Sequence, residues 1–218
     1  MLGKIFERFV EKSPMSVMAR GLLERVLNPK TIDEIFERVA DCQYTRDLLF
    51  STVFDLMSQV VCGSHKSLHA AYQASAQEIG VSVTSVYNKL NGVEPETSAS
   101  LVRYSADVVT PLVEALVGTL EPLLPGYRIK ILDGNCLEAT EHRIHELRGT
   151  AAGPLPGKSL VVLDPSLKLM VDVFPCEDGY TQERALLEQV LPTVQACLRA
   201  ARTGRPVTVG LKIATSAP

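Results

Sequence analysis

The sequence predicts an α+β fold, with an all-helical N-terminal part followed by a part that contains strands. Up to residue 125, apolar side chains recur at intervals of three and four, the spacing of helices that bury one face. Pro122 and the pair Pro125-Gly126 then interrupt this pattern, and the following residues alternate between apolar and charged, as in a strand. We therefore expect a helical domain at 1–125, an α/β domain at 126–197 and a separate tail at 198–218.

Helix boundaries in the first part are marked by capping and breaking residues. Thr31 to Glu34 forms a capping-box pattern that predicts a helix start, after a break at Asn28-Pro29. Further helices are expected at 46–61, 66–79, 83–90 and 98–120, with a kink in the last one near Pro111.

The second part carries a different periodicity. Tyr127 to Leu132 alternates apolar and basic residues, which predicts a strand that ends at Asp133, with a turn at Gly134. Two more strands, at 160–163 and 168–174, are separated by so short a connection that they should form an antiparallel hairpin. A helix is expected at 181–191.

Composition favours an ordinary globular protein of a reducing compartment. The formal net charge is −3, and residues 1–125 carry 11 basic and 15 acidic side chains, which counts against strong non-specific DNA binding. Five cysteines without a CxxC pair indicate free thiols and a cytoplasmic location. No apolar run is long enough to cross a bilayer, so no membrane partner is expected.

The segment from Gly80 to Asn91 resembles the turn and second helix of a helix-turn-helix. Gly80 suits the tight turn, Ser82 can cap the next helix, and apolar residues on one face can lock the helices together. Thr84, Tyr87 and Asn88 then share an outward face. Asn can bond adenine through two hydrogen bonds, while Tyr and Thr can bond phosphates. The expected DNA-binding residues are Ser82, Thr84, Tyr87, Asn88 and Lys89; the alternative is a plain helical hairpin.

Other residues suggest metal binding. Asp133, at a predicted strand end with open space beyond, could hold a divalent ion. Cys62, His65 and His69 invite a zinc site, because His65 and His69 lie one helical turn apart. A fourth ligand with suitable spacing is lacking, so we favour a polar surface at these residues. The same holds for His142 and His145. Asp164 and Asp172 are expected to be structural unless the fold brings them beside Asp133.

Taken together, these segments resemble a DDE-type transposase of a bacterial insertion sequence, whose catalytic core is ribonuclease-H-like. The resemblance rests on Ile131-Leu132-Asp133-Gly134-Asn135, on the hairpin at 160–174, on the helix with Thr181-Gln182-Glu183-Arg184, and on the helical segment at 81–91. It covers about residues 1–195. It implies DNA transposition and recombination, with double-stranded DNA at the element ends as the partner.

The resemblance also implies a catalytic mechanism that the chain does not complete. Three carboxylates would hold two Mg²⁺ ions for strand cleavage and transfer, and Asp133 matches the first carboxylate. The other two should follow the helix at 181–191, but residues 189–218 contain four basic residues and no acid. A truncated, inactive transposase fragment is therefore expected, its tail either a frame-shifted end or a natural basic extension. A non-catalytic helix-turn-helix DNA-binding protein is the alternative, and self-association stays open.

Overall fold

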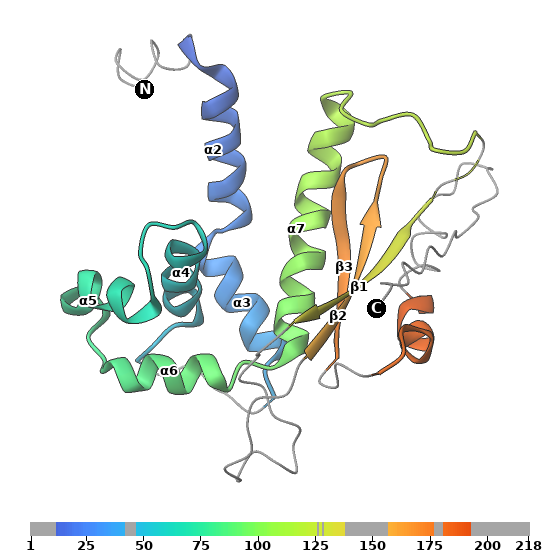
Figure 1. The fold of residues 1–218 in the computed structure, drawn as a ribbon. Coiled ribbons are helices and arrows are strands. Elements are labelled where there is room, and N and C mark those ends of the chain that lie inside the picture. Colours follow the sequence, from blue (N-terminus) through green and yellow to red (C-terminus); the bar gives the residue numbers. More distant parts are fainter. Residues whose placement is uncertain are drawn as a thin grey trace. The chain divides into compact units, whose positions relative to one another are not determined.

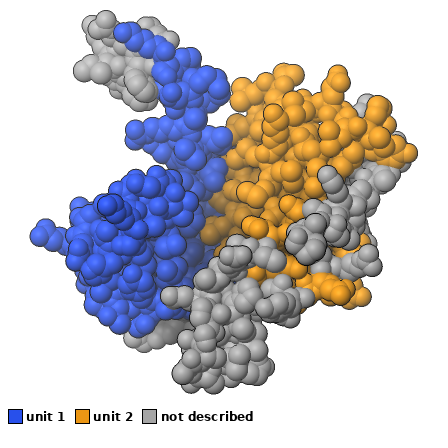
Figure 2. Space-filling model, viewed as in Figure 1, with its two compact units in different colours: residues 1–97 blue, residues 98–218 orange. Residues whose placement is uncertain are grey.

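A computed structural model describes residues 12–41, 47–125, 127, 129–137, 157–176 and 181–192. Within these residues the chain combines six α-helices with one three-stranded antiparallel sheet, which confirms the α+β class (Figure 1). The chain divides into two compact units, residues 1–97 and residues 98–218 (Figure 2). The predicted tail at 198–218 lies outside the described residues.

The first unit is helical in its described part. Its elements, in chain order, are α2 (Pro14–Val26), α3 (Pro29–Val39), α4 (Phe50–Val61), α5 (Leu68–Ile79) and α6 (Val83–Asn91). The bounds of α5 and α6 lie within two residues of the expected ranges, 66–79 and 83–90. Helix α4 begins at Phe50 and not at residue 46, and the start of α3 also differs from its prediction. Asn28 caps α3, because its side chain accepts a hydrogen bond from the backbone N–H of Thr31, and Pro29 opens the helix. The capping box predicted at Thr31 is therefore wrong.

One apolar cluster holds α4, α5 and α6 together. Its buried members come from all three helices and from the segment before α4: Leu48, Val53, Leu56, Leu68, Ala71 and Val86. Partly buried residues complete the cluster, namely Met57, Val60, Tyr72, Ile79, Val81 and Leu90. The apolar residues expected to lock the two helices on either side of Gly80 thus contribute to one core. Removing such side chains from water is the main force that holds the three helices in place.

Helix α3 joins the same unit through aromatic and polar contacts. Phe36 is fully buried and stacks on Phe50 with 4.4 Å between ring centroids. Asp33 accepts two hydrogen bonds from Ser51, one from its backbone N–H at 2.8 Å and one from its hydroxyl at 2.7 Å. The N-cap residue of α4 is Leu49, whose side chain makes no capping hydrogen bond, and the first turn of α4 contains no acid. Asp33 of α3 therefore caps α4 from another helix.

The second unit contains the sheet. Helix α7 (Pro95–Ala115) precedes it, and the strands are β1 (Ile131–Leu137), β2 (Gly157–Asp164) and β3 (Leu169–Cys176), in the order β1-β2-β3. The hairpin predicted between the second and third strands is confirmed, because β2 and β3 pair antiparallel across the turn at 165–168. A short 3₁₀ helix, Glu183–Leu186, continues into α-helix over residues 187–192.

The first strand differs from its prediction. Strand β1 starts at Ile131 and continues through Asp133 and Gly134, which pair with Val161 and Leu160 of β2. Asp133 therefore lies within the strand and not at its end, and Gly134 makes no turn. Pairing with β2 supplies hydrogen bonds along the whole segment and outweighs the local turn tendency of glycine.

The core of the second unit lies on the sheet. Leu132, Leu160, Val162 and Phe174 from the strands pack with Leu186 and Val190 from the last helical segment. Two ion pairs accompany this core, one fully buried and one between a partly exposed arginine and a buried aspartate. Lys130 donates to Asp164, and Arg103 of α7 donates to Asp172 of β3 at 2.8 Å.

Helix α7 groups with the sheet, since the two units divide after Thr97, whereas the predicted division was at residue 125.

Candidate nucleic-acid interface

The candidate interface is built on α5, α6 and the short turn between them. Gly80 ends α5 in the left-handed conformation, with φ of +70°, which favours glycine because it lacks Cβ. Ser82 caps α6, as its hydroxyl accepts the backbone N–H of Ser85 at 3.2 Å. Tyr72 of α5 donates from its hydroxyl to the carbonyl of Val81 at 2.7 Å and fixes the turn. Each residue between the two helices thus has a defined role in the turn: Gly80 ends α5, Val81 accepts a hydrogen bond from Tyr72, and Ser82 caps α6.

Helix α6 has one buried side and one exposed side. Val86 is fully buried, and Leu90 packs with it against the cluster of α4 and α5. Thr84, Tyr87 and Asn88 are exposed, in agreement with the outward face expected from the sequence. The spacing of three and four places them on one face of the helix.

Asn91 extends this exposed face by one turn. It lies three residues beyond Asn88, is exposed, and is the last residue of α6. The sequence prediction ended the helix at Leu90, so Asn91 was missed, although the same three-and-four spacing continues to it. We call Thr84, Tyr87, Asn88 and Asn91 the polar stripe. It offers two amides, one hydroxyl and one phenol, a set that can both donate and accept hydrogen bonds.

Lys89 lies beside the polar stripe in sequence but has a different environment. Its ammonium lies over the ring of Phe36, 4.7 Å from the centroid, in a cation–π contact. Burial lowers the pKa of Lys89, and the negative charge of Asp33 partly offsets that shift. A DNA contact by Lys89 stays a prediction, but the structure gives the side chain a second role inside the unit.

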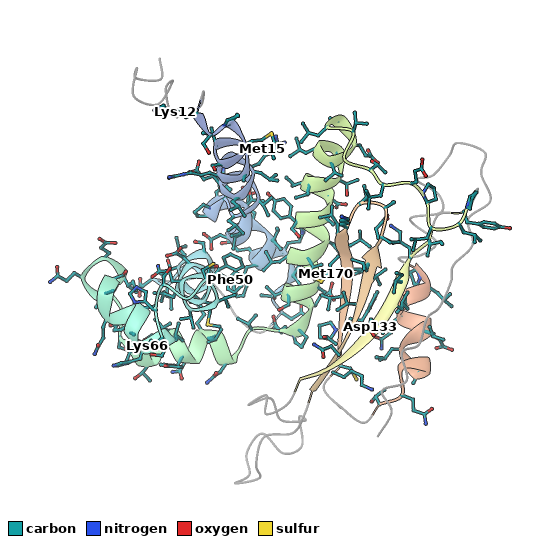
Figure 3. All side chains as sticks on the ribbon, turned by 45° about the horizontal axis from the view of Figure 1, so that its top comes forward. Lys12, Met15, Phe50, Lys66, Asp133 and Met170 are labelled. Carbon is teal, nitrogen blue, oxygen red and sulfur yellow. The ribbon has the colours of Figure 1, made fainter. Side chains whose placement is uncertain are left out.

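Asp133 is an exposed carboxylate on β1 (Figure 3). In the described part of the chain, no group of three or more His, Cys, Asp and Glu side chains could hold a metal ion. The two other aspartates of the described strands have partners of their own. Asp164 accepts hydrogen bonds from Lys130 and the Ser166 amide, and Asp172 accepts one from Arg103. These described residues do not fit a two-metal centre, which needs several anionic oxygen ligands.

Among the described residues, Cys62, His65 and His69 do not come together as part of a group that could hold a metal ion. Cys62 and His69 are exposed, and the imidazole of His69 is within hydrogen-bond distance of Gln73, 3.0 Å. His142 and His145 lie outside the described residues. The surface around α5 is therefore polar, with Lys66 as an exposed cation near the start of the helix.

Comparison with protein-family models, with curated proteins and with solved structures gives no match for this chain. None of the helices among the described residues is long and apolar enough to cross a membrane. What the fold and site define is thus an α+β protein that exposes a polar stripe on a short helix, held against its neighbours by a capped turn.

Proposed function

We propose that the chain binds double-stranded DNA in a sequence-specific manner, with α5 and α6 acting as a helix-turn-helix and α6 as its recognition helix. The observation that carries this proposal is the polar stripe. A helix of nine residues is about 14 Å long, and the major groove of B-DNA admits an α-helix. An exposed helix whose outer face carries amides and hydroxyls, and whose inner face is locked into a core, suits that groove.

The stripe suggests a division of work among its residues. Asn88, in the middle of the stripe, is the residue best placed to bond one base edge, and the base that an amide pairs with through two bonds is adenine. Thr84 and Tyr87 carry hydroxyls that can donate to phosphate oxygens, while Asn91 offers a second amide at the other end of α6. The hydroxyl of Ser82 accepts the backbone N–H of Ser85, so in this proposal Ser82 supports DNA binding by capping the start of α6.

Among the described residues of α5, α6 and the segment just before α5, the cations are few, which sets an expectation for the affinity for DNA. Lys66 is the exposed basic residue near α5, and Lys89 contacts Phe36. Each neutralised phosphate adds about 0.9 to the slope of log affinity against log salt. We expect a shallow slope, of about one to three, and hence binding that depends more on base contacts than on charge.

The experiment uses the full chain and a library of duplexes with a randomised centre. After selection, wild type and Asn88→Ala are compared on the enriched duplex by fluorescence anisotropy. Loss of a two-bond base contact should cost about 1–3 kcal/mol, or roughly 5- to 150-fold in Kd. Asn135→Ala, an exposed asparagine on β1 in the other unit, is the matched control and should bind as wild type does. Failure to enrich any sequence, or equal binding by both Asn variants, refutes the proposal.

The biological setting that we propose for this binding is the end of an insertion sequence, with the chain related to DDE-type transposases. The support is the order of its parts: a helical unit, then a strand with Asp133, then the β2-β3 hairpin. Because the carboxylates of the described residues do not fit a metal pair, we assign no cleavage step to them. If this setting is right, the selected sequence should occur within inverted repeats, and duplexes that carry those repeats should compete for binding. A selected sequence that occurs in no inverted repeat would argue for a stand-alone DNA-binding protein.

A further inference from the structure

The apolar contacts of α6 lie on one side of a short helix that must present the polar stripe in a fixed direction. It has nine residues, and Val86 is its one buried member. Val86 and Leu90 hold the side that faces α4 and α5, but contacts on a single side leave a short helix able to roll about its axis. A second contact, at a different angle around the helix, would prevent that roll.

Lys89 supplies such a contact. Successive residues of a helix are about 100° apart, so Lys89 leaves α6 in a direction different from those of both Asn88 and Leu90. Its ammonium lies over Phe36, which is fully buried and stacked on Phe50, so the platform beneath the ammonium is rigid. Asp33, one turn before Phe36 on α3, is bonded to Ser51 at the start of α4 and keeps α3 in place. Lys89 thus connects α6 to Phe36 of α3, which lies 53 residues earlier in the chain.

We infer that Lys89 is a positioning residue, which sets the rotation of α6 by its contact with Phe36 and thereby aims the polar stripe, and that α3 is a required part of the recognition unit. The contact itself is independent of the proposed function, whereas its consequence for DNA rests on that function. Lys89 then acts on base selection through geometry. A lysine that neutralised a phosphate would instead act on all sequences alike.

The first arm of the test compares Lys89→Met and Lys89→Arg on the selected duplex and on a scrambled one. Methionine keeps the apolar stem and removes the cation, while arginine keeps a cation that can lie over an aromatic ring. For Lys89→Met we expect the preference for the selected duplex to fall about threefold to tenfold, with the salt slope unchanged, and for Lys89→Arg to retain most of the preference. Lys30→Met removes an exposed charge of α3 and should leave the preference intact.

A different result overturns the inference. If Lys89→Met weakens both duplexes equally and lowers the salt slope by about 0.9, then Lys89 is a phosphate ligand and not a positioning residue. Equal preference in Lys89→Met and wild type also overturns it.

The second arm needs no DNA and separates this inference from the proposed function. Hydrogen exchange of the α6 amides is measured in wild type, Lys89→Met, Phe36→Leu and the double variant. Each single variant should lower the protection factors of the α6 amides. If the two side chains act through their mutual contact, the double variant should lose less protection than the product of the two single losses, by a factor of about three to ten. Independent effects, within twofold, overturn the inference even if the chain binds DNA. If wild type binds no duplex, the proposed function fails, and this cycle alone decides whether Lys89 fixes α6.

Discussion

Replacing Asp33 should loosen the start of α4 and, with it, the helical unit that carries the polar stripe. In Asp33→Ala, the Ser51 backbone N–H and hydroxyl both lose their acceptor. Ser51 is 8% exposed, so water replaces these bonds poorly. Loss of a cap costs about 0.5–2 kcal/mol, and bonds to a charged acceptor are at the strong end of the scale. Because Asp33 makes two bonds, we expect a loss of about 2–3 kcal/mol.

The assay is hydrogen exchange of the amides in the first turn of α4, read in the full chain. A loss of 2–3 kcal/mol corresponds to roughly 30- to 150-fold faster exchange through local opening. Ser51→Ala removes the hydroxyl bond and keeps the backbone bond, so it should cost about 1 kcal/mol, a clear step below Asp33→Ala. Exchange rates within threefold of wild type in Asp33→Ala, or equal rates in the two variants, would refute the reasoning that Asp33 caps α4.

Three further outcomes follow from the same contacts. Arg103→Met should destabilise the second unit by about 1–3 kcal/mol, more than Asp172→Asn, because it leaves the buried carboxylate without this cation. Urea unfolding followed by circular dichroism decides, and the reverse order contradicts the account. Gly80→Ala should cost about 1–2 kcal/mol in a thermal melt, from backbone strain alone, because an added Cβ meets no atom within 4 Å; a neutral result would mean the turn relaxes. Burial lowers the folded-state pKa of Lys89 below its ordinary value, so the folded chain releases this proton more readily than the unfolded chain does. Wild type should therefore gain stability relative to Lys89→Met as pH rises from the lowered pKa toward 10.5, and a loss of stability over that window would contradict the direction of the shift.

The sequence was informative where the decisive contacts are close along the chain. Gly80 and Ser82 specify a turn and a helix cap within a few residues, and the apolar spacing of α6 shows which side is buried, so the exposure of Thr84, Tyr87 and Asn88 could be predicted. The β2-β3 hairpin was predictable for the same reason, since a short turn forces its strands to pair.

The predictions that failed, and the contacts that were missed, depend on partners distant in sequence. Gly134 looked like a turn because nothing local shows that β2 pairs along the whole of β1. Asp33 looked like part of a local capping box, but its carboxylate binds Ser51 of another helix. Lys89 is visibly basic in the sequence, yet its direction toward Phe36 depends on how α3 packs. A sequence shows which side chains are charged, but it does not show which group each of them contacts in the fold.

The most direct test of the central claim replaces one atom of the DNA. On the selected duplex, the adenine assigned to Asn88 is exchanged for 7-deazaadenine, which lacks the N7 acceptor in the major groove. For the wild-type chain this should remove one of two bonds and weaken binding by about 0.5–1.5 kcal/mol, or roughly 2- to 12-fold. For Asn88→Ala the same exchange should change nothing, because the partner amide is already absent. An equal effect of the exchange in both chains, or none in either, would contradict the account of α6 as a helix that reads bases in the major groove.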